Sequence, residues 1–360
     1  MPADQPAGRP LRVGIVGLGF GVSHHLPAWM AAGAEVVALC SARPGRGAEV
    51  AKAKGIAQGY DDWRVMYERA DLDVVVVATR PDQHAEPVIA ALERGLHVVC
   101  EKPMSASLDD AERMAAAAER AGGVSAIDFE FRLSGPRIAL KRAVEAGRIG
   151  EVRSFQWNVR YSSVGRFESV PHGWLWEPAA GGLLLALGSH HFDTVRWIAG
   201  PFADDAAATR WAAVPRHSGI GTGADDAFTL TAGLAGGGGA SVSFTPSHGF
   251  FESVAAVVGT EGTLLLDDVA QTVELHDGSR LTTVFDDATE PAIGGPDDLV
   301  PRVARFARLF IDAVHGTRSP DLATFRDGVE IQYVLDRATS HTEFPVRGLQ
   351  RTRSDHGGHR

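Results

Sequence analysis

The sequence between Leu11 and residue 130 alternates short apolar segments with longer helical stretches, and this alternation limits the possible folds more than any other feature. The apolar segments predict strands, namely LRVGIV (11–16), EVVALC (35–40), DVVVVAT (73–79) and HVVCEKP (97–103). The third segment is apolar throughout, as expected for a strand covered on both faces. Helical segments lie between and after these strands, at 47–55, 84–95 and 107–123. Strands that alternate with helices at this spacing predict βαβ units and a parallel sheet.

A different pattern begins after residue 150. Segments 151–161, 228–234, 240–246, 253–259 and 262–268 resemble strands, and turn residues rather than helices separate most of them. Strands at hairpin spacing predict an antiparallel sheet. Three further helices are expected at 182–198, 299–314 and 324–339.

The two patterns predict two domains. We expect a Rossmann-type, doubly wound parallel sheet over residues 11–130, followed by an α+β domain over 131–344 that is built on a large open antiparallel sheet. The last two helices are free to pack back on the first domain. Residues 1–10 and 346–360 are polar and are expected to form flexible tails.

Composition excludes several classes of protein. A chain of 360 residues suits two domains, and its net charge of -10 argues against binding to nucleic acid or to anionic lipid. The two cysteines are too few for a disulfide framework. No apolar run approaches the length of a membrane span, and the first ten residues lack the layout of a signal peptide. We therefore expect a cytoplasmic protein.

A glycine-rich turn, Gly17-Leu18-Gly19-Phe20-Gly21-Val22, connects the first strand to the first helix. In a Rossmann unit, the first glycine permits a tight turn and the second lets the backbone approach a pyrophosphate. The helix N-terminus then offers free N–H groups to the phosphates. The usual third small position holds Val22, but the turn follows the first strand of a clear βαβ series. We expect Gly17, Gly19, Phe20 and Gly21 to contact a dinucleotide.

The end of the second strand indicates which dinucleotide is bound. An acidic residue there would accept hydrogen bonds from the ribose of NAD and would repel a 2′-phosphate. This chain has Ser41, Arg43 and Arg46 instead, and arginine pairs well with phosphate. These three residues also suit an ordinary loop. We favour NADP over NAD.

Lys102 lies in the segment Cys100-Glu101-Lys102-Pro103, at the carboxyl end of a predicted parallel strand. Ligands of open α/β sheets bind outside these strand ends. A lysine there is able to donate a proton to a carbonyl oxygen as hydride arrives at carbon, and to accept it in the reverse reaction. The alternative is a surface lysine before a turn proline.

Taken together, the Gly17 turn, Glu101-Lys102-Pro103, Gly181-Gly182 with Gly188-Ser189-His190, and VGTEGTLLLDD (258–268) resemble the Gfo/Idh/MocA oxidoreductases. The resemblance extends from Leu11 to about Phe344. It implies a Rossmann domain, a second domain with an open sheet that often forms oligomers, and a substrate cleft between the two. It also implies a cis Lys102–Pro103 peptide.

The resemblance assigns roles to individual residues. Lys102 would be the catalytic acid or base and would also contact the cofactor, as would Glu101. His190 would help to bind and protonate the substrate oxygen. Thr79, Arg80 and His84 match a loop near the nicotinamide, although Arg80 and the following Asp82 depart from the usual loop sequence.

The family commonly carries an aspartate four residues before this histidine, where the present chain has Ala186. Asp193 lies one turn after His190 and is a candidate to orient its imidazole. The alternative is that Asp193 only satisfies a neighbour in the helix packing.

Three further residues are candidate substrate contacts, although each taken singly is better explained as structural. They are Arg132, Tyr161 and Trp174. No metal site is expected, because consecutive histidines on a helix point about 100° apart and cannot easily bind one ion. This applies to His190 with His191 and to His24 with His25.

The leading hypothesis is an NADP(H)-dependent oxidoreductase that acts on a sugar, cyclitol or related polyol, with Lys102 as acid or base and His190 assisting. A homodimer or homotetramer is expected, because a large uncovered sheet face would otherwise be exposed. Two alternatives remain. One is an NAD-dependent glycosidase that oxidises its substrate transiently, and the other is a non-catalytic regulator that senses NADP or a sugar.

Overall fold

The computed structural model of the protein describes residues 9–161, 175, 182–211, 224–246, 250–278, 280–287 and 299–339. The predicted tail at 346–360 and most of the tail at 1–10 lie outside this range. So do Trp174 and Gly181. No helix of the described residues is long and apolar enough to cross a membrane.

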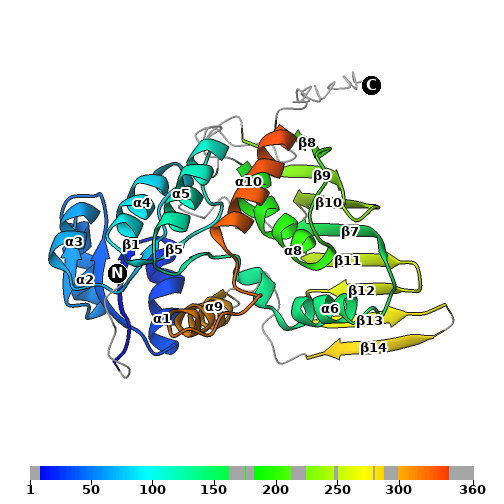
Figure 1. The fold of residues 1–360 in the computed structure, drawn as a ribbon, viewed down its shortest axis with the longest axis horizontal. Coiled ribbons are helices and arrows are strands. Elements are labelled where there is room, and N and C mark those ends of the chain that lie inside the picture. The colour runs from blue at the N-terminus through cyan, green and yellow to red at the C-terminus, as the bar shows by residue number, and fades with distance from the viewer. Residues whose placement is uncertain are drawn as a thin grey trace, which may run out of the picture.

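The first sheet has six strands in the order β3-β2-β1-β4-β5-β6, all parallel. This sheet and its connecting helices make up the blue-to-cyan part of the ribbon in Figure 1. Its strands are β1 (Arg12–Val16), β2 (Glu35–Cys40), β3 (Gln58–Tyr60), β4 (Val74–Val77), β5 (His97–Cys100) and β6 (Ser125–Ile127). The connecting helices are α1 (Leu26–Ala31), α2 (Arg46–Lys54), α3 (Trp63–Arg69), α4 (Ala85–Glu93) and α5 (Leu108–Arg120). This is the strand order of a dinucleotide-binding sheet, so the predicted doubly wound architecture is confirmed.

Two local features of the first sheet follow directly from the sequence. The four valines of β4 are fully buried, because helices cover both faces of the strand. Helix α5 begins at Ser107, whose side chain accepts a hydrogen bond from the backbone N–H of Asp110. Helix α3 and strands β3 and β6 were not predicted, because they are short and lack a clear periodicity.

The second sheet has eight strands in the order β14-β13-β12-β11-β7-β10-β9-β8. They are β7 (Val152–Tyr161), β8 (Ala207–Trp211), β9 (Ala227–Gly233), β10 (Gly239–Pro246), β11 (Glu252–Gly259), β12 (Thr263–Asp267), β13 (Thr272–His276) and β14 (Leu281–Asp286). All neighbours are antiparallel except β7 and β10, which pair in parallel. The open antiparallel sheet is therefore confirmed in the main, with this one exception.

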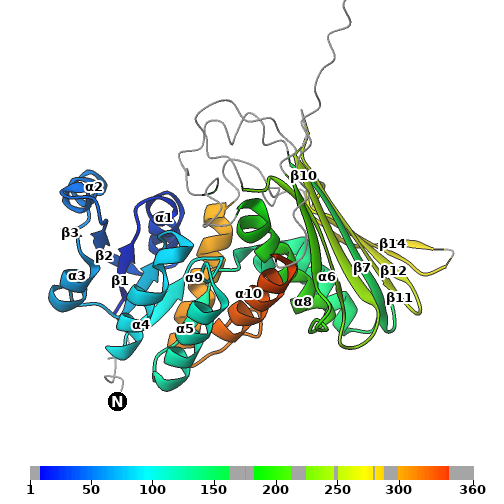
Figure 2. The ribbon, with the colours of Figure 1, turned by 90° about the horizontal axis from the view of Figure 1, so that it is seen from above.

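Helices cover one face of the second sheet (Figure 2). They are α6 (Gly135–Glu145), α8 (Ser189–Ala199) and α10 (Phe325–Thr339), and α8 continues a short π-helix at Leu184–Gly188. Alternate residues of β7, including Phe155 and Trp157, point into this covered face and are buried. No helix of the described residues lies on the opposite face.

The last two helices return to the first sheet. Helix α9 (Leu299–Val314) packs on α1, where Phe310 meets Trp29 edge to face with a centroid distance of 5.6 Å. Helix α10 packs on both α5 and α8 (Figures 1 and 2). The C-terminal helices thus contribute to the core of the first sheet and connect it to the second.

A fully buried ion pair joins α6 to the second sheet. Arg137 donates to both carboxylate oxygens of Asp268, at 3.1 and 2.9 Å, and to Thr194 Oγ1 on α8. Ser253 donates to Asp268 as well, and Trp157 donates to Ser253. Each nitrogen of the guanidinium and each oxygen of the carboxylate therefore has at least one hydrogen-bond partner in the core, which offsets the loss of hydration of the two groups.

We predict that Asp268→Ala lowers the free energy of unfolding by roughly 3–5 kcal/mol, because it leaves the Arg137 charge buried without its partner. Urea unfolding followed by tryptophan fluorescence measures this loss. The control is Asp286→Ala at the exposed end of β14, which should change stability by less than about 0.5 kcal/mol. Equal effects of the two substitutions would contradict the assigned role of the pair.

Candidate active site

The glycine turn after β1 is built for a close approach of backbone to backbone. Gly17 has φ +107°, and a Cβ at this position would lie 2.2 Å from the carbonyl oxygen of Ala78. Gly21 packs on β1, since a Cβ there would lie 2.8 Å from Ile15 Cγ2. Gly21 therefore supplies the close helix–strand packing one position before the usual third small position, which holds Val22. Between Gly17 and Gly21, Gly19 is exposed and Phe20 is half-buried. The backbone of the turn at Gly19 is therefore accessible to solvent.

The loop after β2 holds the three residues predicted to contact the ribose phosphate. Ser41 Oγ accepts a hydrogen bond from Arg43 N, while the Arg43 side chain is exposed. Arg46 is also exposed and pairs with Glu49, one turn later in α2, at 2.7 Å. Asp61, which follows β3, accepts hydrogen bonds from the backbone of this loop at Gly45, at 2.7 Å. Asp61 was not predicted as part of this loop, because it follows β3 and is about 20 residues beyond the end of β2 in the chain.

The loop after β4 holds Thr79, Arg80 and His84. Thr79 and Arg80 are half-buried, and Arg80 pairs with Asp82 at 3.1 Å. His84 is fully buried, and its two ring nitrogens face the carbonyl oxygens of Thr79 and Met104, each at 3.1 Å. Burial lowers the pKa of His84. In this structure His84 therefore ties Thr79 to the segment after Lys102, and only Thr79 and Arg80 of the three are accessible to a ligand.

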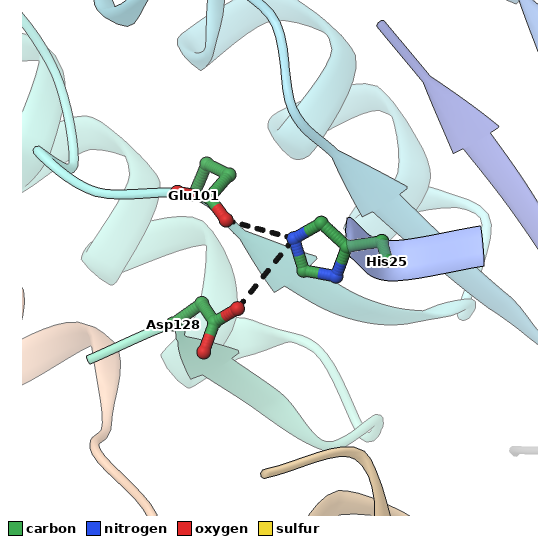
Figure 3. Close-up of side chains that lie close together, drawn as sticks. All are labelled: His25, Glu101 and Asp128. Atoms are coloured by element: carbon green, nitrogen blue, oxygen red, sulfur yellow. Dashed lines mark hydrogen bonds and ion pairs between the residues drawn. The ribbon is translucent and has the colours of Figure 1, made fainter. Parts of the chain in front are cut away.

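Glu101, at the end of β5, belongs to a buried cluster with His25 and Asp128 (Figure 3). His25 Nε2 lies 2.7 Å from Glu101 Oε1 and 3.5 Å from Asp128 Oδ2. Trp29 Nε1 donates to His25 Nδ1 at 3.3 Å, and tryptophan is only a donor. The hydrogen of His25 must therefore be on Nε2, where it is donated to Glu101. Two carboxyl groups therefore lie next to His25, and Glu101 is the one that accepts its hydrogen bond.

Lys102 lies between the first sheet and the helix that carries His190. The Lys102–Pro103 peptide is cis, as the family resemblance implied. Lys102 Nζ donates a hydrogen bond to the carbonyl oxygen of Ala186 at 3.3 Å, one helical turn before His190. The ammonium group thus lies next to Ala186, the position at which the family commonly has an aspartate. Here the backbone oxygen of Ala186 accepts the hydrogen bond.

His190 is 1% exposed and stacks on Phe131, with ring centroids 4.1 Å apart. Its Nε2 lies 3.7 Å from Glu130 Oε1, while Nδ1 has no hydrogen-bond partner among the described residues. Burial, and then the positive charge of Lys102, hold the pKa of His190 well below its usual range. The imidazole is therefore neutral at physiological pH and has one donor nitrogen and one acceptor nitrogen.

Asp193 points away from His190. Its two carboxylate oxygens accept hydrogen bonds from Arg132, at 2.6 and 2.5 Å, and both side chains are buried. No hydrogen bond between Asp193 and His190 is found in the described part of the chain. The structure therefore favours the alternative in which Asp193 satisfies a neighbour, and Arg132, predicted to contact substrate, is that neighbour.

Of the other predicted substrate contacts, Tyr161 is the last residue of β7 and packs edge to face on Phe251, with centroids 5.4 Å apart. Trp174 lies outside the described residues. Lys102 and the helix of His190 thus lie close together, whereas Tyr161 lies at the carboxyl end of strand β7.

Two buried acids near Lys102 were not predicted. Asp128 follows β6, and Glu130 begins a short 3-10 helix at Glu130–Leu133. Burial raises the pKa of Asp128 well above its usual range, and neighbouring Glu130 and Glu101 raise it further. Burial likewise raises the pKa of Glu130 to about 8, although Lys102 lowers it. Burial also acts to raise the pKa of Glu101, but the hydrogen bond from His25 and the charge of Lys102 outweigh it and leave the pKa lowered.

These shifts divide the protons among the three acids. At neutral pH, Glu101 is ionised and balances Lys102, while Glu130, with a pKa of about 8, is largely protonated, and the raised pKa of Asp128 favours its protonated form. Residues 128–133 show no periodicity or motif in the sequence. Their side chains belong to the site because the segment after β6 is buried in the folded chain.

We predict a pH-dependent effect of Glu130→Gln on stability. The pKa of Glu130 is about 8 in the folded chain and near 4.5 when unfolded, so the native state binds the extra proton between these values. The free energy of unfolding of the wild type should therefore fall with rising pH, on the order of 1 kcal/mol per pH unit from this group. The variant should lack this contribution.

Urea unfolding at pH 5, 6, 7 and 8 measures the difference between the two proteins. Glu145→Gln, at an exposed glutamate of α6, serves as the control and should follow the wild type. If Glu130→Gln and wild type show the same pH slope, the buried carboxyl is not protonated in the folded state.

Comparison with known proteins shows the family to which the chain belongs. The model of an oxidoreductase family with an NAD-binding Rossmann fold matches residues 11–129, and the model of the Gfo/Idh/MocA C-terminal domain matches residues 138–265. The chain is 32% identical to the 1,5-anhydro-D-fructose reductase of Ensifer adhaerens over 242 residues, which cover 65% of this chain and 69% of that protein. It is also 32% identical to the D-apiose dehydrogenase of Paraburkholderia graminis over 276 residues, 75% of this chain and 71% of that protein.

Solved structures of similar proteins match a larger share of the chain than these relatives do. A levoglucosan dehydrogenase in complex with NADH and levoglucosan superposes with a TM-score of 0.80 and 25% identity, covering 92% of this chain and 97% of that one. The matches to both family models, the two sheets and the position of Lys102 agree with one another. The chain belongs to the Gfo/Idh/MocA family of oxidoreductases.

Proposed function

We propose that this protein is an NADP(H)-dependent oxidoreductase that transfers a hydride between the nicotinamide and a hydroxyl or keto carbon of a sugar, cyclitol or related polyol. The position of Lys102 carries the proposal. Its ammonium group lies at the carboxyl end of β5 and contacts the turn of helix that leads to His190. Relatives that are named as sugar and inositol dehydrogenases support the class of substrate.

The chain fits a dinucleotide at the first sheet. A Cβ at Gly17 would fill the space next to Ala78, and the exposed backbone at Gly19 begins the helical segment that follows β1. A bound nicotinamide dinucleotide would supply or accept the hydride. Gly17, Gly19, Phe20 and Gly21 would hold its pyrophosphate, with Thr79 and Arg80 at the end of β4.

The chain's own residues would move the proton. During reduction, Lys102 Nζ donates a proton to the carbonyl oxygen as the hydride arrives, and during oxidation it accepts the proton of the hydroxyl. His190, which is neutral, contributes a hydrogen bond to the same oxygen. Glu101 remains ionised and stabilises the charge of Lys102.

We predict that Lys102→Met lowers kcat by about 100-fold or more, because the site loses its acid–base group. The affinity for NADPH should change little. The assay first measures binding by NADPH fluorescence and then turnover on a panel of ketoses and cyclitols. Lys52→Met, at an exposed lysine of α2, is the control and should keep full activity. Unchanged turnover in Lys102→Met would remove this lysine from the mechanism, and binding without turnover by the wild type would contradict the proposed activity.

The preference for NADP rests on the loop after β2. Ser41 and the exposed Arg43 follow β2, the strand whose end would face the 2′-position of the ribose, and Arg46 follows at the start of α2. The relatives of known structure include complexes with NADH, and Asp61 adds a negative charge to the same loop. The carboxylate of Asp61 already accepts backbone hydrogen bonds, and Arg46 pairs with Glu49, so the exposed Arg43 carries the proposed contact with the phosphate.

We predict that Arg43→Ala weakens NADPH binding by roughly 10-fold or more, since a charge-assisted hydrogen bond to the phosphate contributes about 1.5–3 kcal/mol. Binding of NADH should stay within twofold of the wild type. Calorimetric titration with both nucleotides checks this, and Arg153→Ala on the second sheet is the control. A wild type that prefers NADH would overturn the NADP assignment.

We also expect a homodimer or homotetramer formed through the open face of the second sheet. Val254, Ala256 and Leu265 point to this face and are only half-buried within one chain. Sheet faces of this kind are normally covered by another surface. Light scattering of the purified protein measures the state, and a monomer would contradict the expectation.

A further inference from the structure

His25 lies in the buried cluster of Figure 3, and the proposed mechanism gives it no role. Its side chain is fully buried, and it ends the π-helix at Gly21–His25, which follows the glycine turn directly. Glu101, its neighbour in the cluster, lies 76 residues later in the chain. A buried imidazole carries two polar nitrogens into the core, so the partners of these nitrogens indicate what the residue does there.

Both ring nitrogens of His25 have a hydrogen-bond partner, and the two partners fix the orientation of the ring. Trp29 Nε1 donates to Nδ1 at 3.3 Å, so Nδ1 is an acceptor and Nε2 carries the hydrogen. Nε2 lies 2.7 Å from Glu101 Oε1 and donates to it. The ring of Phe20 also approaches the imidazole edge to face, with centroids 5.6 Å apart. The Nε2–H bond is thus held in the direction of Glu101.

Asp128 is the other carboxyl group near this donor, but the hydrogen bond goes to Glu101. Asp128 Oδ2 lies 3.5 Å from His25 Nε2, compared with 2.7 Å for Glu101 Oε1. Burial raises the pKa of Asp128 well above its usual range, which favours its neutral form. A neutral carboxyl group attracts an N–H donor less strongly than a carboxylate does. Distance and charge therefore agree on Glu101 as the acceptor.

The carboxylate of Glu101 connects His25 to Lys102. Its second oxygen, Oε2, accepts a hydrogen bond from the backbone N–H of Lys102 at 3.1 Å. One oxygen of this buried carboxylate thus binds His25, and the other binds the backbone of Lys102. At the far end of the lysine side chain, Nζ donates to the carbonyl oxygen of Ala186. Lys102 is therefore held at both ends, and its backbone end depends on the orientation of the Glu101 carboxylate.

The donor at His25 is the part of this arrangement that fixes the carboxylate from the side opposite Lys102. A hydrogen bond with an ionised acceptor is stronger than a neutral one, and its loss would leave Glu101 free to rotate about its side-chain bonds. A catalytic group that is displaced by about 1 Å can lose on the order of 100-fold in rate. The position of His25 is therefore important for Lys102, although the two side chains belong to different segments of the chain.

We propose that His25 is a positioning residue that fixes the carboxylate of Glu101 and, through it, the catalytic Lys102. The inference rests on the proposed function, in which Lys102 transfers the proton. His25 acts from inside the protein and needs no contact with a bound molecule. Because it belongs to the helical segment that follows the dinucleotide turn, one buried hydrogen bond connects that segment to the lysine.

Two polar substitutions that differ mainly in reach test the role of the donor. The amide nitrogen of glutamine extends about as far from the backbone as imidazole Nε2, whereas the side chain of asparagine is one methylene group shorter. His25→Gln should therefore still donate to Glu101, and His25→Asn should not. His25→Leu removes the donor altogether. The matched control is Phe310→Leu, which weakens the packing around Trp29 but leaves the hydrogen bonds of His25 in place.

The first readout is the chemical reactivity of Lys102 in the full chain, which requires no substrate. Acetic anhydride acylates the neutral, accessible amine of a lysine, and peptide mass spectrometry compares Lys102 with the exposed Lys52. A displaced Glu101 no longer stabilises the ammonium form. The relative reactivity of Lys102 should therefore rise about threefold or more in His25→Asn and His25→Leu, the factor typical for the net loss of one hydrogen bond. It should stay near the wild-type value in His25→Gln and Phe310→Leu.

The second readout is the initial rate with a substrate that the wild type turns over. In His25→Asn and His25→Leu, kcat should fall roughly 10- to 100-fold, because the proton-transfer group is displaced. KM should change less than kcat, since the substituted residue does not contact the substrate. His25→Gln should recover most of the lost kcat. A residue with only a structural role would not show this dependence on the reach of one nitrogen.

Three results would overturn the proposal. They are an unchanged reactivity of Lys102 in both His25→Asn and His25→Leu, a rise in His25→Gln as large as that in His25→Asn, and an equal rise in Phe310→Leu. Circular dichroism checks that each variant is folded, and if His25→Leu is not, the comparison of His25→Gln with His25→Asn decides.

Failure of this proposal is distinguishable from failure of the proposed function. A reactivity of Lys102 that depends on His25 supports the positioning role even if no substrate of the panel is turned over, and the absence of turnover then counts against the proposed function alone. Normal turnover with an unchanged reactivity of Lys102 in His25→Asn and His25→Leu supports the proposed function and overturns the role of His25.

Discussion

The buried ion pair between Arg132 and Asp193 is the interaction on which the geometry of the site depends. It joins the segment that leaves the parallel sheet to helix α8, and Asp327 of α10 approaches Arg132 at 3.7 Å from a third element. Two charges of opposite sign at bidentate distance offset much of the free energy of removing them from water. Because Glu130 and His190 lie only a few residues from this pair, their separation is set by it.

The charge around Lys102 shows how the fold places one cation among several acids without an excess of buried charge. Only Glu101, which accepts a hydrogen bond from His25, is ionised together with Lys102. Burial favours the protonated forms of Asp128 and Glu130, and repulsion between carboxylates in the interior adds to this effect. Two carboxyl groups with raised pKa values therefore lie close to Lys102, the proposed acid or base of the reaction.

The sequence was informative where structure is local and less so where it is not. Four of the six strands of the parallel sheet, the Gly17 turn and the position of Lys102 follow from short-range patterns, and the structure has them where they were expected. Glu130 carries no such signal, because an acid in a short 3-10 helix looks the same whether it is buried or exposed. Asp193 was assigned by helical spacing to His190, but its partner is 61 residues earlier in the chain. The parallel pairing of β7 with β10 is likewise a tertiary outcome.

The packing of α9 and α10 has a consequence for the order in which the chain becomes stable. Phe306 and Phe310 complete the same apolar cluster as Val13, Ile15 and Trp29, although about 280 residues separate them. A ribosome that has made only the first sheet has therefore not yet made the side chains that cover it. The apolar surface of the first sheet therefore stays partly uncovered on the nascent chain until the last helices emerge. The N-terminal core is completed only when the C-terminal helices have been synthesised.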